Sequence, residues 1–197
     1  MSKKAEQILR AAEKVFGQER RFHKVTLDDV CQEAGIGKGT IYRYFQDKED
    51  LYWNVILAGQ ETLLHSAQEA AAGTEDPRKA LRCVAACMMD FYMQRSNLFG
   101  LMWGENLRNS AGRHKVDEGW RKQGASLVAI IADLMHRAIK QKDYVSACPP
   151  EELAQMFLAM INASLWHMGN AKQKDHWLGN IMDLAENGLL QRKRKPK

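Results

Sequence analysis

The chain has 197 residues, of which 45% are hydrophobic and 27% are charged, the ordinary balance of a globular protein with a buried core. Its apolar runs are far shorter than a bilayer span, which excludes a membrane-spanning protein. The start, Met-Ser-Lys-Lys, lacks the apolar core of a secretory signal, so we expect a cytoplasmic protein.

The net charge of +5 does not by itself indicate a nucleic-acid partner, because the charge is unevenly distributed. Five basic residues lie within residues 192–197, so residues 1–191 are formally neutral. A basic terminal run is typical of a solvated, disordered tail. The case for DNA binding must therefore come from a motif.

The cysteines give little support for a metal site. Cys83 and Cys87 lie one helical turn apart, a spacing at which two thiols can share a metal. The same spacing is typical of small apolar residues on a packed helix face, and no Cys-x-x-Cys or His-rich segment accompanies the pair. We predict no metal and no cofactor.

The first helix is predicted from the spacing of its apolar residues, which recur every three or four positions from Ala5 to Phe16. Gly17 ends this pattern. Residues 18–25 are polar apart from Phe22, which predicts a loop with one anchoring aromatic side chain.

Two short helices are predicted next. Thr26 suits the N-cap of a helix that runs to about Ala34, and Asp29 stands at the capping-box position three residues later. Gly35 suits a left-handed helix end. The following short helix is predicted over residues 38–44.

The remaining elements are also helical. Asp47, with Asp50 three positions later, caps a long helix that runs to roughly Ala70, and Pro77 suits the first turn of the next helix. Further helices are predicted around 98–107, through 127–138, from Pro149 to near Gly169, and from Asp175 onward. No strand-like alternation of useful length occurs, so we expect an all-α fold of about nine helices.

Residues 27–44 carry the functional information. Helices of about eight residues are not stable alone, so these two must pack against each other and against the first helix. Apolar residues lie where two steeply crossing short helices would meet: Val30, Ala34, Ile36 and Ile41. This arrangement is typical of a helix-turn-helix, whose second helix enters the major groove of DNA. Any two short helices of a bundle can show the same spacing, so the pattern alone leaves both interpretations open.

Four runs in this region resemble the DNA-binding domain of the TetR family of repressors: Phe16-Gly17, Val25 to Val30, Ala34 to Phe45, and Lys48 to Leu51. The distinctive part is Gly-Thr-Ile-Tyr-x-Tyr-Phe-x-x-Lys-x-x-Leu over residues 39–51. The resemblance covers about residues 5–57, and the rest of the chain matches the family only in length and helix count.

The resemblance implies a domain organisation. Residues 1–47 would form a three-helix helix-turn-helix domain. Residues 48–191 would form a helical domain for effector binding and dimerisation, and 192–197 a disordered basic tail.

The resemblance also implies two sets of DNA contacts. Base edges would be contacted by Lys38, Gly39 and Tyr42, because lysine donates to guanine, tyrosine contacts the thymine methyl group, and glycine lets the backbone approach. Phosphates would be held, without reading sequence, by Thr26, Thr40, Arg43, Tyr44 and Lys48.

The sequence departs from the family pattern in several places. Gly37 stands where the family often has Ser or Thr, Cys31 replaces a more usual alanine, and the loop over residues 18–21 is slightly longer than is typical. The acidic residues Asp28 and Asp29 argue against base contacts from the second helix.

One helix-turn-helix makes few contacts, so the architecture implies a two-fold homodimer on a pseudo-palindromic operator. The last two helices are rich in methionine and aromatic residues, which are enriched at interfaces. We predict the interface at Met156, Met160, Trp177, Ile181 and Ala185. Ordinary core packing is the alternative for these residues.

The middle helices carry polarisable side chains that can line an apolar pocket. The candidate effector contacts are Met88, Phe91, Tyr92, Met102, Trp103 and Trp120, again with core packing as the alternative. We expect a repressor that is released from DNA by a small, largely apolar effector. The effector would favour a spacing of the recognition helices that does not match successive major grooves.

Three functions are alternatives to an effector-controlled repressor. A protein of the same fold can act through a protein partner without an effector. A purely structural helical dimer would bind DNA weakly and without sequence preference. An enzyme is not expected, because the sequence has no glycine-rich phosphate loop, no His-Glu-x-x-His and no recognisable nucleophile.

Overall fold

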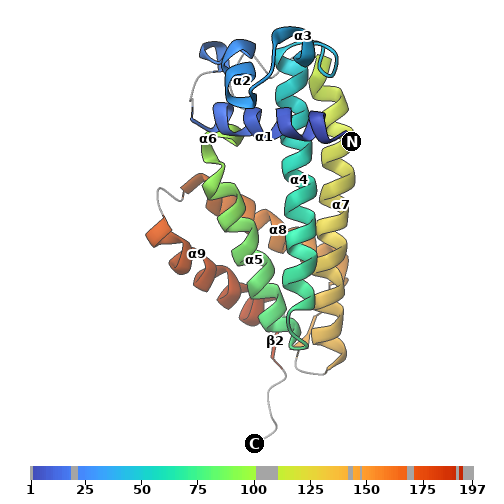
Figure 1. Cartoon of the computed structure of the whole chain (residues 1–197). Coiled ribbons are helices and arrows are strands. Elements are labelled where there is room, and N and C mark those ends of the chain that lie inside the picture. Colours follow the sequence, from blue (N-terminus) through green and yellow to red (C-terminus); the bar gives the residue numbers. More distant parts are fainter. Residues whose placement is uncertain are drawn as a thin grey trace, which may run out of the picture. The chain divides into compact units, whose positions relative to one another are not determined.

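The computed structural model describes residues 2–18, 22–100, 111–141, 144–146, 148–167, 171–189 and 191–192. These ranges are almost entirely helical, which confirms the predicted all-α fold (Figure 1). The α-helices in them are α1 (Lys3–Gln18), α2 (Leu27–Ala34), α3 (Lys38–Ile41), α4 (Lys48–Ala72), α5 (Pro77–Gln94), α6 (Ser96–Gly100), α7 (Ala111–Lys140), α8 (Pro150–His167) and α9 (Ala171–Leu184).

Four shorter elements complete the described chain. The 3-10 turn η1 (Phe22–Lys24) follows α1, and the π-helical turn η3 (Ala185–Leu189) continues α9. Strands β1 (Tyr144–Val145) and β2 (Gln191–Arg192) pair antiparallel. Two-residue strands are too short to produce an alternating pattern, so the sequence did not predict them.

The chain divides into two compact units. The first comprises residues 1–62 and 95–122, and the second comprises residues 63–94 and 123–197. Helices α4 and α7 therefore each contribute to both units. The domain boundary near residue 47 stays a prediction, and the unit that contains α1 to α3 continues beyond it.

Aromatic side chains form the centre of the first unit. The Tyr52 ring packs edge-on against Phe16 and Phe22, with centroids 5.2 Å and 5.4 Å away, and Phe16 stacks on Phe22 at 5.8 Å. The predicted anchoring role of Phe22 is thus confirmed, although Phe22 lies in η1 rather than in an irregular loop. These contacts hold α1 across the first part of α4 (Figure 1).

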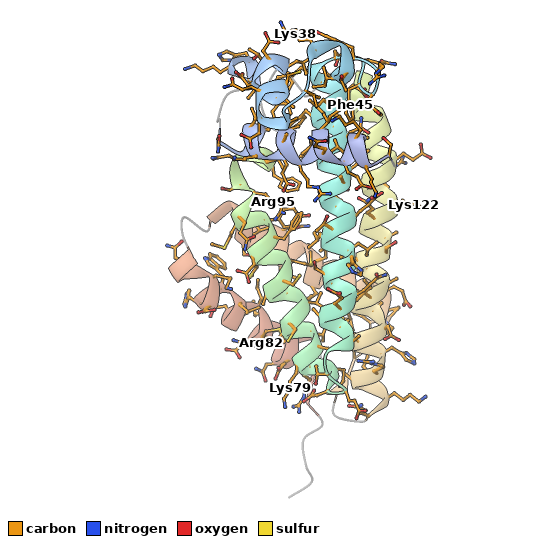
Figure 2. All side chains as sticks on the ribbon, in the orientation of Figure 1. Lys38, Phe45, Lys79, Arg82, Arg95 and Lys122 are labelled. Carbon is orange, nitrogen blue, oxygen red and sulfur yellow. The ribbon has the colours of Figure 1, made fainter. Side chains whose placement is uncertain are left out.

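Polar bonds attach α6 to α1 and α4 within the same unit. The Tyr52 hydroxyl donates to the Leu98 carbonyl at 2.7 Å, and burial raises the pKa of this hydroxyl, which keeps it protonated. The Arg95 guanidinium contacts the Glu13 carboxylate at 2.7 Å, and Asn97 donates to the Gly17 carbonyl at 3.0 Å. Figure 2 labels Arg95 beside α1.

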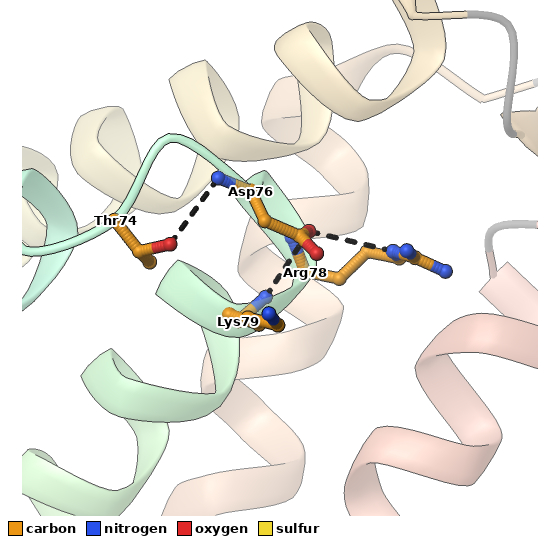
Figure 3. A network of polar contacts seen from close by, with 4 residues as sticks. All are labelled: Thr74, Asp76, Arg78 and Lys79. Carbon is orange, nitrogen blue, oxygen red and sulfur yellow. Dashed lines mark hydrogen bonds and ion pairs between the residues drawn. The ribbon is translucent and has the colours of Figure 1, made fainter.

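The N-termini of α4 and α5 have side-chain caps, as predicted for α4. The Asp47 carboxylate accepts from the Asp50 N–H at 2.8 Å. Before α5, the Asp76 carboxylate accepts from the N–H groups of Arg78 and Lys79 at 2.9 Å and 3.4 Å (Figure 3). Such bonds satisfy N–H groups that have no partner inside the helix.

The predicted helix around 98–107 lies partly outside the described residues, and the boundaries of α3 and α9 differ from the prediction. Helix α3 ends at Ile41 instead of residue 44, because the N–H groups of Tyr44 and Phe45 both bond to the Ile41 carbonyl in a turn that buries Phe45. Helix α9 begins at Ala171 rather than at Asp175. Residues 171–174 are Ala, Lys, Gln and Lys, all good helix formers, so the helix starts one turn earlier.

In the second unit, α5 packs against α8 and α9. Fully buried side chains from α5 and α8 supply its core, among them Met88, Met89, Phe157 and Ile161. The Lys174 ammonium contacts both oxygens of the Asp90 carboxylate, at 2.7 Å and 2.9 Å, and so attaches α9 to α5. None of the described helices has the length and apolar character needed to cross a bilayer.

The buried hydroxyl of Tyr52 provides a test of the first unit. We expect Tyr52→Phe to lower the free energy of unfolding by about 1–3 kcal/mol, because it leaves the Leu98 carbonyl without its donor. Urea denaturation of the full chain measures this. Tyr44→Phe, which removes the hydroxyl of an exposed ring, is the control and should change the value by less than about 0.5 kcal/mol. Equal stability of the two variants would contradict this role of Tyr52.

Candidate nucleic-acid interface

Helix α2 begins with the predicted capping box. The Thr26 hydroxyl accepts from the Asp29 N–H at 3.2 Å, and the Asp29 carboxylate accepts from the Thr26 N–H at 2.8 Å. Bonds from the Thr26 hydroxyl and N–H lower the pKa of the Asp29 carboxyl. This reciprocal cap fixes where α2 starts.

The turn between α2 and α3 depends on Gly35. Its φ of 63° lies in the left-handed region, as the sequence predicted, and its N–H bonds to the Gln32 carbonyl at 3.2 Å. The next N–H, that of Ile36, bonds to the Cys31 carbonyl at 3.0 Å. The chain therefore reverses within two residues and brings α3 against α2.

The surface between the two helices is apolar and closed. Val30 and Ile41 are completely buried, and Ala34 is buried beside them, as expected for a helix-turn-helix. Cys31 is buried on the same side of α2, and this burial raises the pKa of its thiol. Helix α1 supports the pair from behind, since Gln7 donates to the Ala34 carbonyl at 2.7 Å.

Most of the predicted DNA contacts lie on the opposite side of α3 and in the turn after it, whereas Thr26 and Lys48 lie at the starts of α2 and α4. Tyr42 and Tyr44 are exposed, with 58% and 39% of their surface accessible. The other exposed members of the set are Thr26, Lys38, Gly39 and Arg43, whereas Thr40 is half-buried. Figure 2 shows Lys38 projecting from the outer surface of this unit, on the side away from α1.

Lys48 has internal partners that the sequence did not reveal. Its ammonium donates to the carbonyls of Phe22 and Val25 at 2.9 Å and 2.8 Å and lies 4.4 Å from the centre of the Phe22 ring. Partial burial lowers the pKa of this group. Lys48 thus fixes η1 relative to the start of α4, and one of its three N–H bonds remains for another acceptor.

Asp28 is the second residue whose place the sequence did not reveal. Its carboxylate lies 2.6 Å from the Lys38 ammonium, and both side chains are more than half exposed. This hydrogen bond raises the pKa of Lys38. The contact joins the first turn of α2 to the first residue of α3, so it depends on how the two helices cross, which no local sequence pattern specifies.

Comparisons with known proteins agree with this geometry. The model of the family described as bacterial regulatory proteins, tetR family, matches residues 8–53, which include α2, α3 and the start of α4. The transcriptional activator FasR of Mycolicibacterium smegmatis is 30% identical over 97 residues, which are 49% of this chain and 44% of that protein. The transcriptional repressor BepR of Brucella suis is 26% identical over 166 residues, which are 81% of this chain and 78% of that protein.

The chain belongs to the TetR family. It is a DNA-binding transcription regulator, as the curated relatives are. The fold extends the likeness beyond the matched region. The regulator FadR of Bacillus subtilis, solved in complex with stearoyl-CoA, aligns with a TM-score of 0.72 and 19% identity, covering 93% of this chain and 98% of that one.

In this TetR-family chain, the predicted dimer contacts lie on α8, α9 and η3. Met156 is 45% exposed, and Met160 and Trp177 are half-buried. Ile181 and Ala185 are only 3% and 1% exposed, so their own chain already covers them.

A further exposed apolar residue of α9 is Leu184. It is 58% exposed and lies one heptad after Trp177. Leu184 was not predicted, because it does not share the spacing of the buried positions of α9.

The candidate effector residues are only partly described. Met88 and Phe91 are buried on α5, and the Phe91 ring packs against the ring of Tyr92 with centroids 5.5 Å apart. Burial raises the pKa of Tyr92 to about 12. Met102 and Trp103 lie outside the described residues, as does the side chain of Trp120.

Substitution of Gly35 tests whether the turn holds the recognition helix. We expect Gly35→Ala to lower the free energy of unfolding by about 1–2 kcal/mol, because a Cβ disfavours the left-handed backbone. Beyond the neighbouring residues of the chain and the backbone of the same helix, no atom lies within 4 Å of a Cβ added at Gly35 or at Gly39, so a comparison of the two isolates the backbone effect.

Gly39→Ala is the matched control for this substitution. It should leave stability unchanged or raise it by up to about 1 kcal/mol, since Gly39 lies inside α3. Urea denaturation of both variants gives the comparison. A loss at Gly39 as large as the loss at Gly35 would show that the left-handed turn is not the cause.

Proposed function

We propose that this TetR-family regulator is a cytoplasmic homodimeric repressor, which binds a pseudo-palindromic operator and is released by a small, largely apolar effector. The observation that carries the DNA-binding part is the outward face of α3, where Tyr42 is 58% exposed on a tightly supported backbone. Tyrosine is enriched at interfaces, and here it stands on the same face as charged side chains. The major groove is the partner that a second helix of this geometry fits.

The side chains on this face divide into two roles. Lys38, Gly39 and Tyr42 approach base edges, where lysine finds guanine acceptors and tyrosine the thymine methyl group. Phosphates are held by Thr26, Thr40, Arg43, Tyr44 and the remaining N–H bond of Lys48. On this view residues 1–47 are the DNA-binding domain, and residues 48–191 regulate it.

Dimerisation would place two such faces on successive major grooves. Along α8, the exposed or half-buried residues Met156, Met160 and Ala163 recur every three or four positions and form an apolar stripe. Trp177 and Leu184 form a second stripe on α9. We place the interface on these stripes, with Ile181 and Ala185 supporting them from behind.

Two comparisons support repression and an apolar effector. BepR, a repressor by name, matches 81% of this chain, whereas the match to the activator FasR covers 49%. FadR of Bacillus subtilis, which shares the fold, was solved with stearoyl-CoA. In this chain, Met88, Phe91 and Tyr92 give α5 the apolar and polarisable surface that such a ligand needs.

Two neighbouring substitutions separate base contacts from phosphate contacts. We expect Tyr42→Ala to relax discrimination at one base pair of each half-site, because it removes a contact to a base edge. We expect Arg43→Ala to weaken binding to all duplexes about equally and to lower the slope of log affinity against log salt by about 1.

Operators selected from random duplexes supply the DNA for this test. Fluorescence anisotropy with the selected operator and its single-base-pair variants then measures both effects. If both variants bound like the wild type, these residues would not contact DNA. If the wild type selected no sequence, the proposed function itself would be wrong.

The apolar stripe on α9 gives a test of the dimer. We expect Leu184→Glu to weaken self-association by about 100-fold or more, because each protomer would bury a charge in place of a leucine. Sedimentation velocity over a range of concentrations measures the change. Ala129→Glu, which puts the same charge on an exposed site of α7, should leave the dimer intact. A dimer unaffected by Leu184→Glu would place the interface elsewhere.

A further inference from the structure

The ion pair between Asp28 and Lys38 brings an acceptor and a donor together on the face that we assign to DNA. The carboxylate oxygen and the ammonium nitrogen are 2.6 Å apart, and the two side chains are 57% and 65% exposed. Tyr42, the most exposed aromatic residue of this face, lies four residues after Lys38, and its N–H bonds to the Lys38 carbonyl at 3.4 Å. The pair therefore belongs to the same surface as the predicted base contacts.

Stability does not explain the pair. Exposed ion pairs contribute little to folding, because water screens them and two side chains must be ordered. Asp28 is also unfavourable for DNA binding if it acts alone, since a carboxylate repels phosphates. A function that uses both charges at once explains why an acidic residue stands on a face assigned to DNA.

We propose that Asp28 and Lys38 form a specificity-determining pair that reads one G·C base pair in each half-site. The inference rests on the proposed DNA-binding function. Lys38 donates to the N7 and O6 acceptors of guanine, and Asp28 accepts from the N4 amino group of the paired cytosine. These are the groups that each base presents in the major groove.

The geometry of the pair suits this base pair. Guanine O6 and cytosine N4 are joined by a Watson–Crick hydrogen bond of about 2.9 Å, close to the ordinary length for N–H···O. The ammonium and carboxylate of the protein are held at a similar separation, so they face the acceptor and the donor side by side. An A·T pair also places a donor beside an acceptor, but it lacks the two adjacent acceptors that guanine offers to lysine.

The carboxylate also restrains the lysine. A free lysine side chain reaches any nearby phosphate and so favours non-specific binding. Held by Asp28, the Lys38 ammonium stays at the start of α3, and part of its rotamer freedom is lost before DNA arrives. Asp28 thereby increases specificity in two ways, by its own base contact and by directing Lys38 to guanine.

The chain contains a matched control on the same helix. Glu33, also on α2, pairs with Lys14 at 2.7 Å, and these side chains are 35% and 58% exposed. This second pair joins α2 to α1, the helix behind the recognition pair. Asp28→Ala and Glu33→Ala therefore remove the same charge and the same kind of ion pair from different faces.

The experiment measures binding of the full-length chain to its selected operator and to every single-base-pair variant. For the wild type we expect one G·C pair in each half-site to be preferred over the other pairs by about tenfold or more. In Asp28→Ala this preference should fall to about threefold or less, while preferences at other positions persist and binding to non-operator DNA strengthens. Glu33→Ala should leave the whole profile within about twofold of the wild type.

Other outcomes overturn the inference. If Asp28→Ala changes affinity for all duplexes by one common factor, the residue acts only through general charge or through folding. Thermal unfolding of both alanine variants identifies a folding defect, and Asp28→Asn then provides a variant that keeps the side-chain size. Loss of the G·C preference in that variant supports the pair, and an unchanged preference in both Asp28 variants refutes it. Failure of the wild type to select any operator would refute the proposed function as well.

Discussion

The left-handed backbone at Gly35 is the constraint on which the DNA-binding face depends. Helix α3 has a single turn and cannot be stable alone, so its direction is set by the reversal at Gly35 and by the burial of Ile41. Once the two helices cross in this way, Lys38 meets Asp28 and Tyr42 points outward. The backbone conformation of Gly35 thus determines where the side chains of Asp28, Lys38 and Tyr42 lie, all within seven positions of it along the chain.

Aromatic packing and hydrogen bonds within the first unit support this face. Phe16, Phe22 and Tyr52 interlock, and the Tyr52 hydroxyl bonds to the carbonyl of Leu98 in α6. A buried hydroxyl that lost this acceptor would be left unsatisfied, so α6 is held in one register relative to α4. The recognition helix therefore stands on a framework in which α1, α4 and α6 have little freedom to shift independently.

Local rules predicted the beginnings and ends of elements well. The capping box of Thr26, the left-handed turn at Gly35 and the cap at Asp47 each depend on residues within three positions, and all three are present. Two boundaries were predicted wrongly: α3 ends at Ile41 because a turn follows it, and α9 begins at Ala171 because helix propensity extended it before the expected cap. The all-α fold followed from the repeated three- and four-residue spacing.

Contacts between different helices could not be predicted from the sequence. Lys48 looked like an exposed cation in a first helical turn, but its partners are carbonyls more than twenty positions earlier. The charge of Asp28 is unfavourable for DNA binding when the residue is considered alone, and the sequence did not show that Asp28 pairs with Lys38 on the next helix. Leu184 is exposed because of how α9 packs, which periodicity alone does not show. In each case the missing information is tertiary, since the partner depends on how two elements cross.

The two lysines of the proposed interface share one physical property, which bears on how DNA binding is achieved. Each ammonium is positioned before DNA arrives, Lys38 by a carboxylate and Lys48 by two carbonyls and an aromatic ring. An unrestrained lysine loses rotamer freedom on binding, and this loss offsets part of the attraction to phosphate or base. Lys48 has lost more of that freedom than the exposed Lys38, so its contact with DNA would cost less entropy, and an altered position of η1 would weaken that contact directly.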